Sequence, residues 1–186
     1  MRLEKTPLED CFILHEEPFI DDRGYFVESF NKKTFKSLTG LDIEFVQDNQ
    51  SMSSKGVLRG LHLQTGDSAQ AKLVRVLKGK VLDVAVDLRK SSKSFGQYFS
   101  IELTDQNRKQ LFIPAGFAHG FIVLSKTAIF SYKVDKFYSP GNELGIIYND
   151  EFLNIDWILP KEEIRVSEKD LTLKSFKEVV TQLKQL

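Results

Sequence analysis

The 186-residue chain has little cysteine, no excess of either charge and no long apolar segment, and each of these absences excludes a class of protein. Its only cysteine is Cys11, which excludes a disulfide within the chain and a cysteine-rich zinc site. Lys and Arg together number 26, as do Asp and Glu, so net charge gives no reason to expect nucleic acid or an anionic membrane as a partner. The stretch "MRLEKTPLED" has no apolar signal core, and no apolar run reaches membrane-spanning length, so a cytoplasmic protein is expected.

Apolar residues, by contrast, are present in the proportion of an ordinary globular protein. They make up 41% of the chain, and phenylalanine alone accounts for 15 residues. Large rings favour a β-rich core, where they have wide surfaces to cover. The length predicts a single domain over residues 1–186, large enough to bury a substantial core.

Short strands separated by turns dominate the pattern. The segments "LVRVLKG" and "KVLDVAVDLR" predict two strands around a turn at residues 78–80. In the second of these, one face carries Leu82, Val84, Val86 and Leu88, and the other carries Asp83, Ala85 and Asp87. The segments "YFSIELT", "QLFIPAGFAHGFIVLS" and "AIFSYKVDKFY" continue the series. Regular short strands of this kind predict an all-β sandwich or barrel.

Two short helices are predicted beside this β core. The segment "NKKTFKSLTG" has a helix start at Asn31 and a stop at Gly40. The tail "SFKEVVTQLKQL" begins with a capping box formed by Ser175 and Glu178. The chain is therefore expected to have helical additions near its amino terminus and at its carboxyl terminus.

Two of the three histidines lie in spaced motifs. "GVLRGLHLQ", with His62, and "PAGFAH", with His119, resemble the two signature motifs of the cupin superfamily, a small double-sheet β-barrel. A metal-binding cupin has His-x-His and a glutamate in the first motif, but here Gln64 stands for the second histidine and "TGDSAQAK" holds no glutamate. With two of four ligands missing, no metal and no other cofactor is expected.

From the residues alone, His62 has two open interpretations. In a regular strand over 58–63, Leu58, Gly60 and His62 would share one face, and Arg59 and Leu61 the other. A polar ring on a buried face needs a hydrogen-bond partner, since burial without one costs free energy. His62 is then either a satisfied core residue or a functional one.

Six segments in this order closely resemble the dTDP-4-dehydrorhamnose 3,5-epimerase family. They are "FIDDRGYFVESFN", "FVQDNQSMSSKGVLRGLHLQ", "AKLVRVLKGKVLDVAVDLRK", "IPAGFAHGF", "SYKVDKFYSPGNELGI" and "SEKD", and the likeness runs from about residue 10 to 173. The resemblance implies a metal-free double-stranded β-helix (cupin or jelly-roll barrel), usually a homodimer. It also implies a dTDP-linked 4-keto-6-deoxysugar substrate, dTDP-4-dehydro-6-deoxy-D-glucose, epimerised at C3 and C5 on the route to dTDP-L-rhamnose.

The same resemblance implies a catalytic set. His62 would be the base, Asp170 would orient its ring, Tyr132 would be the acid, and Lys72 would lie near the C4 oxygen. The strand over 128–134 is consistent with this role, because Tyr132 shares a face there with apolar residues Ala128, Phe130 and Val134. Without the family, a core tyrosine and an exposed lysine are the competing interpretations.

A second set would hold the nucleotide. By resemblance, Arg59, Arg23 and Lys169 contact the diphosphate, which suits the guanidinium fork. The other implied substrate contacts are Glu28, Gln47, Asn49, His119, Tyr138, which would stack on thymine, and Glu143. Each could instead be a surface or turn residue. For Arg23 in "DDRG" this alternative is strong, because Asp-Arg-Gly is also a common turn sequence.

The chain departs from the family pattern at two positions. Leu144 and Tyr148 stand where many members have arginine and tryptophan, which leaves the exact sugar and nucleotide preference open. These departures leave the catalytic set intact, and two alternatives accompany the main prediction. One is an epimerase that acts only at C3 of a related dTDP-4-keto-6-deoxysugar, and the other is a non-catalytic cupin that binds a nucleotide sugar.

Overall fold

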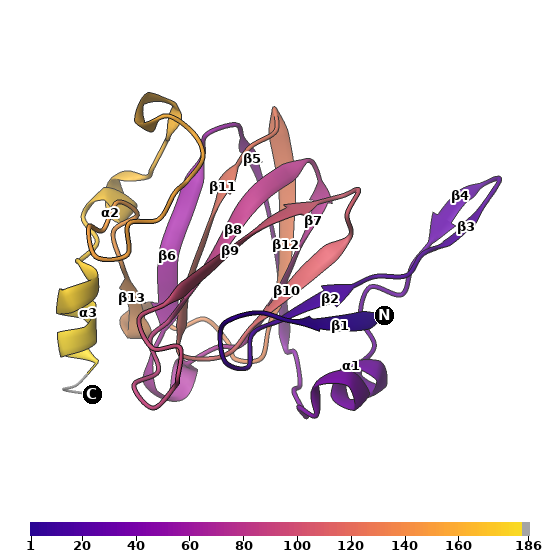
Figure 1. Cartoon of the computed structure of the whole chain (residues 1–186), viewed down its shortest axis with the longest axis horizontal. Coiled ribbons are helices and arrows are strands. Elements are labelled where there is room, and N and C mark those ends of the chain that lie inside the picture. Colours follow the sequence, from indigo (N-terminus) through magenta and orange to yellow (C-terminus); the bar gives the residue numbers. More distant parts are fainter. Residues whose placement is uncertain (184–186) are drawn as a thin grey trace.

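A computed structural model describes residues 1–183 (Figure 1). Its strands are β1 (Arg2–Lys5), β2 (Phe12–His15), β3 (Phe19–Asp21), β4 (Gly24–Phe26), β5 (Gln47–Ser54), β6 (Leu58–Gln64), β7 (Lys72–Lys78), β8 (Lys80–Asp87), β9 (Tyr98–Thr104), β10 (Lys109–Ile113), β11 (Phe117–Val123), β12 (Thr127–Val134) and β13 (Glu143–Gly145). The helices are α1 (Lys32–Thr39), α2 (Glu168–Leu171) and α3 (Phe176–Gln182). Every strand expected from the sequence is present within this set.

Two antiparallel sheets form the body of the molecule (Figure 1). One has the order β1-β2-β10-β7-β12-β5, and the other has the order β13-β6-β11-β8-β9. Neighbours such as β7 and β12 or β6 and β11 are distant in the sequence, so each sheet joins segments from both halves of the chain. This double-sheet arrangement is the one predicted.

Strand β8 shows how the two cores are divided. Val81 and Ala85 point into the space between the sheets, where they meet Phe121 and Phe130. The alternate residues of β8 point outward, but they too are buried, because the carboxyl-terminal segment covers that face with Trp157 and other apolar side chains. Every residue of Val81–Asp87 is therefore buried, which explains why this strand is so apolar.

Helix α1 begins and ends where the sequence predicted, and α3 begins at its predicted cap but ends at Gln182. The Asn31 side chain accepts hydrogen bonds at the start of α1, and Gly40 ends it in the left-handed conformation. Ser175 and Glu178 form the predicted capping box of α3, whose predicted continuation over 184–186 lies outside the described residues. Helix α2 was not predicted as a helix, although Ser167 caps it. In the part of the chain described, no helix has the length and apolar character needed to cross a membrane.

An aromatic cluster fixes α1 against the outer face of the six-stranded sheet. The Phe35 ring lies 5.9 Å from that of Phe45 and 5.4 Å from that of Phe112, both in edge-to-face contact, and Phe30 packs beside them. Such pairs add about 0.5–1.5 kcal/mol each beyond the area they bury.

A hairpin of β3 and β4, here called the arm, projects from the body (Figure 1). Its apolar side chains are largely exposed: Phe19 is 75% exposed, Ile20 74% and Phe26 70%. The segments before and after the arm are held to the sheet, because the Gln110 amide donates to Glu16 at 2.6 Å and to the Ser29 carbonyl at 2.7 Å. The base of the arm is thus held by hydrogen bonds to β10, while its apolar side chains face solvent.

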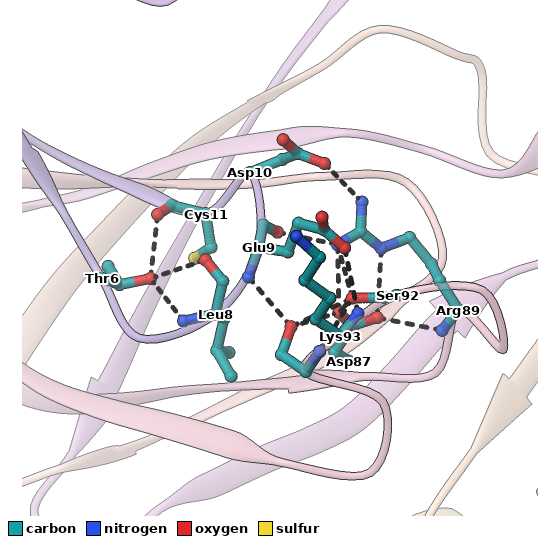
Figure 2. Close-up of polar contacts among 10 residues, drawn as sticks. Thr6, Leu8, Glu9, Asp10, Cys11, Asp87, Arg89, Ser92 and Lys93 are labelled. Atoms are coloured by element: carbon teal, nitrogen blue, oxygen red, sulfur yellow. Dashed lines mark hydrogen bonds and ion pairs between the residues drawn. The ribbon is translucent and has the colours of Figure 1, made fainter.

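A buried polar network joins the amino-terminal loop to the loop after β8 (Figure 2). The Asp87 carboxylate is fully buried and accepts hydrogen bonds from Arg89 and Ser92, while Arg89 reaches Asp10 at 2.9 Å. Nearby, burial raises the pKa of the Cys11 thiol to about 12, so this cysteine stays protonated and unreactive.

Candidate active site

A cavity of about 680 Å³ opens where β5, β6, β7, β11 and β12 meet the segment that leads into α2. Its wall consists of Asn49, Gln50, Ser51, Val57, Leu58, Arg59, His62, Lys72, His119, Phe121, Phe130, Tyr132, Arg165, Val166, Ser167, Lys169 and Asp170. Eight of the residues predicted to act on the substrate are in this wall, although they come from distant parts of the sequence.

An irregularity in β6 sets the direction of its polar side chains. His119 pairs with His62 and Phe121 pairs with Arg59, so two residues of β6 lie opposite the single Gly120 of β11. This is the geometry of a β-bulge. The predicted alternation, which placed Arg59 and His62 on opposite faces, is wrong, because the extra residue brings both side chains to the same cavity.

His62 is paired with a buried carboxylate. Its Nε2 lies 2.7 Å from Oδ1 of Asp170, while Oδ2 of Asp170 accepts from the Gly60 backbone N–H at 3.3 Å. Burial alone would raise the Asp170 pKa, but the His62 hydrogen bond and nearby charge outweigh it and hold that pKa below its usual value. The Ser167 hydroxyl at the start of α2 accepts a hydrogen bond from the Asp170 backbone N–H, which fixes the backbone position of Asp170. The carboxylate is therefore charged and positioned at neutral pH.

Lys72 and His119 lie deeper in the wall. Burial lowers the pKa of Lys72 to about 8, against the opposing charges of Asp83 and Glu143. His119 binds the fully buried Asp83 carboxylate, with Nε2 2.9 Å from Oδ2, yet burial still lowers the His119 pKa. Asp83 was not predicted as a site residue. The sequence signal was an acidic residue in the middle of an apolar strand.

Tyr132 faces the cavity from β12, as its strand pattern indicated. Burial raises the pKa of its phenol above the usual value, while the charge of Arg59 opposes the change. Arg59 donates from Nε and Nη2 to the Ser53 hydroxyl, 3.2 Å away in both cases, which fixes the guanidinium at the cavity wall. The phenol therefore keeps its proton at neutral pH.

The remaining predicted contacts near the cavity form hydrogen-bonded pairs. Glu143 accepts from Lys169 and from the Tyr138 hydroxyl, each at 2.7 Å. Burial opposes ionisation of Glu143, but these two donors hold its pKa below the usual value. Gln47 donates to Asn49 at 2.8 Å, so the amide of Asn49 in the wall is oriented by its neighbour.

Arg23 and Glu28 do not lie at this cavity. Arg23 sits at the turn of the arm with 86% of its side chain exposed, and it pairs with Asp21. Glu28 accepts from Asn31 at the start of α1. Within one chain these two predicted substrate contacts are therefore apart from the other predicted contacts.

Three residues that depart from sequence motifs have structural contacts: Leu144, Tyr148 and Gln64. Leu144 and Tyr148 pack into the core under the carboxyl-terminal segment, so they lie in packing positions. The Gln64 oxygen accepts from the Ser139 backbone and supports the loop next to Tyr138. Among residues 1–183, no three His, Cys, Asp or Glu side chains form a group that could hold a metal.

The relation to known proteins is now clear. The family model described as dTDP-4-dehydrorhamnose 3,5-epimerase matches residues 5–178. The chain belongs to the dTDP-4-dehydrorhamnose 3,5-epimerase family. A relative in this family from Escherichia coli (strain K12) is 50% identical over 170 residues, which cover 88% of this chain and 92% of the relative.

Solved structures of the family agree with the fold. The dTDP-4-dehydrorhamnose 3,5-epimerase from Elizabethkingia anophelis is 54% identical, with a TM-score of 0.93 over 96% of this chain and 97% of that one. A dTDP-6-deoxy-D-glucose-3,5-epimerase from Legionella pneumophila, solved in complex with dTDP-4-keto-L-rhamnose, is 44% identical, with a TM-score of 0.93 over 98% and 96%. The predicted family and barrel are confirmed. The roles of individual residues stay predictions.

Proposed function

We propose that His62, Tyr132 and Lys72 carry out the reaction for which the family is named. The substrate is dTDP-4-dehydro-6-deoxy-D-glucose, and epimerisation at C3 and C5 gives dTDP-4-dehydro-L-rhamnose for dTDP-L-rhamnose biosynthesis. The observation that carries the proposal is the His62–Asp170 pair at 2.7 Å, which opens onto the same cavity as the Tyr132 phenol.

The chemistry needs a base, an acid and a positive charge. The C4 ketone acidifies the hydrogens on C3 and C5, so removal of either one gives an enolate. Return of a proton to the opposite face of that carbon inverts it. A base and an acid on opposite sides of the ring, with a cation near the enolate oxygen, are therefore sufficient.

His62 suits the role of base. The charged Asp170 can only accept a hydrogen bond, so Nε2 of His62 carries the hydrogen and the lone pair of the neutral ring is on Nδ1. Nδ1 takes the proton from carbon, and the carboxylate stabilises the imidazolium that results.

Tyr132 and Lys72 supply the other two requirements. The raised pKa of Tyr132 keeps its phenol protonated, so it can deliver a proton to the enolate carbon. Lys72, with a pKa of about 8, is mostly charged at neutral pH, and we place its ammonium beside the C4 oxygen. His119, held by Asp83, then forms the wall next to the sugar.

The nucleotide occupies the outer part of the cavity in this proposal. Arg59 and Lys169 meet the diphosphate, and Asn49, oriented by Gln47, meets the thymine edge. Tyr138 stacks on the thymine ring while Glu143 holds its hydroxyl. The complex of the Legionella pneumophila relative with dTDP-4-keto-L-rhamnose supports a ligand of this class.

We further propose a homodimer built on the arm. In an isolated chain the apolar surface of Phe19, Ile20 and Phe26 would face water, which is unfavourable in free energy. If Arg23 and Glu28 contact substrate, they must do so at the cavity of a second copy, because they do not reach their own. A cytoplasmic location is part of the same proposal.

Incubation with dTDP-4-dehydro-6-deoxyglucose in deuterium oxide tests the function. Deuterium at both C3 and C5, with inverted product, is expected. Deuterium at C3 alone would instead support the narrower epimerase. Binding of the sugar nucleotide without any exchange would make the chain a binding module and overturn the catalytic proposal.

A further inference from the structure

Arg165 lies at the rim of the cavity, on a segment whose backbone is fixed. Its N–H donates to the Gly56 carbonyl at 2.8 Å, and its own carbonyl accepts from the Leu58 N–H at 2.9 Å. These bonds form a parallel bridge between Arg165 and Val57, which precedes Arg59 by two residues. The rim segment thus carries an arginine close to the one on β6.

The charges of the cavity wall are unevenly paired. The wall contains Arg59, His62, Lys72, His119, Arg165 and Lys169 but only one acidic residue, Asp170. Asp170 is engaged by His62, and Lys169 is neutralised by Glu143. In the part of the chain described, neither Arg59 nor Arg165 has an ion-pair partner, and the Arg59 guanidinium donates hydrogen bonds to the neutral Ser53 hydroxyl.

We propose that Arg165 is a further diphosphate-binding residue, acting with Arg59 on the nucleotide end of the substrate. This inference rests on the proposed function and extends its substrate contacts. Two guanidinium forks on neighbouring segments match the two phosphoryl groups of a nucleoside diphosphate, since each fork can bind two phosphate oxygens. Lys169 is expected to attract the diphosphate less strongly, because its charge is already paired with Glu143.

This placement gives the rim segment two tasks. Asp170 orients the base, and Arg165, on the same short stretch, binds the diphosphate. Arg165 does not touch the reacting carbons, so its loss weakens binding of ground state and transition state alike. It is a binding residue, and its removal is expected to raise KM while kcat stays nearly constant.

Calorimetric titration of the full-length protein with dTDP and, separately, with thymidine tests the assignment. Arg165→Ala should weaken dTDP binding by about 10- to 100-fold, the size expected for loss of hydrogen bonds between charged groups. Thymidine, which has no phosphate, should bind as before. Arg165→Lys should restore part of the loss, because lysine keeps the charge but not the fork.

The matched control is Arg2→Ala. Arg2 is an exposed arginine of β1 outside the cavity wall, so this variant loses the same charge elsewhere. Unchanged dTDP affinity in a folded Arg165→Ala protein would overturn the inference, as would an equal loss of thymidine affinity or a fall in kcat at constant KM. Deuterium exchange by the wild-type enzyme separates the two proposals, because it succeeds or fails regardless of the role of Arg165.

Discussion

Replacement of Asp170 by asparagine tests the catalytic pair in detail. The two carboxylate oxygens have different partners: Oδ1 meets Nε2 of His62 at 2.7 Å, and Oδ2 accepts from the Gly60 N–H at 3.3 Å. In Asp170→Asn the amide oxygen keeps the Gly60 bond, so the amide NH₂ turns towards His62. The imidazole must then present its lone pair at Nε2 and carry its hydrogen on Nδ1, the atom that should remove the substrate proton.

The expected loss follows from this wrong tautomer. A positioned general base contributes about 10²- to 10⁴-fold to rate, and the same change in serine-protease triads, a known example, lowers kcat by about 10⁴. We therefore expect Asp170→Asn to lower kcat by about 10²- to 10⁴-fold. Deuterium incorporation at C3, followed by mass spectrometry, measures the proton-removal step directly. Affinity for dTDP should stay within a few-fold, because Asp170 faces the base and not the nucleotide.

Glu168→Gln is the control for this variant. Glu168 is an exposed residue of the same helix, outside the cavity wall, and its replacement removes the same charge. It should leave kcat near the wild-type value. If Asp170→Asn were folded, bound dTDP normally and still exchanged deuterium at the wild-type rate, the assignment of the pair would be refuted.

Three further changes separate the acid, the cation and the bulge. Tyr132→Phe should still allow deuterium exchange at C3 but should reduce the amount of inverted product by about 10²-fold or more. The control Tyr98→Phe, at an exposed tyrosine, should give the wild-type amount of inverted product. Normal inversion by Tyr132→Phe would contradict the acid role. Because the Lys72 charge is present below its pKa of about 8 and lost above it, kcat/KM should fall as pH rises through that value. Lys72→Arg should shift this fall to higher pH. An unchanged pH profile in Lys72→Arg would contradict the role of Lys72 as the cation near the C4 oxygen. Gly60→Ala would place its Cβ 2.6 Å from the β11 backbone, so it should lower the free energy of unfolding by about 1–3 kcal/mol in chemical denaturation and reduce activity. Gly24→Ala, with a positive φ but open space around it, should cost less, and equal losses would argue against a role for the close approach.

The sequence pattern predicted the fold well because its signals are local. Alternation located the strand that became β12, and a capping residue with a following glycine bounded α1. The direction of Arg59 was predicted wrongly, since periodicity assumes a regular strand and a bulge depends on the partner β11. The pairing of Asp83 with His119 was missed because the two come from different strands.

The placement of Arg23 could not follow from sequence patterns for a related reason. Its turn was recognisable in "DDRG", and the structure confirms that Arg23 bonds Asp21 there. The direction in which the arm leaves the body depends on tertiary contacts such as those of Gln110, which no local pattern records. Spatial relations between distant segments were therefore the part that needed the structure.

The extra residue in β6 makes the common direction of Arg59 and His62 depend on the bulge. If β6 kept its present length but ran as a regular strand without the bulge, strict alternation would put one of the two side chains on the covered face among Leu61 and Leu63. The protein would keep its barrel, but either the proposed base or the proposed diphosphate-binding arginine would leave the cavity. Surface loops can vary in length at little cost, whereas here a one-residue change in the pairing of β6 with β11 would separate the residue proposed to hold the substrate from the residue proposed to act on it.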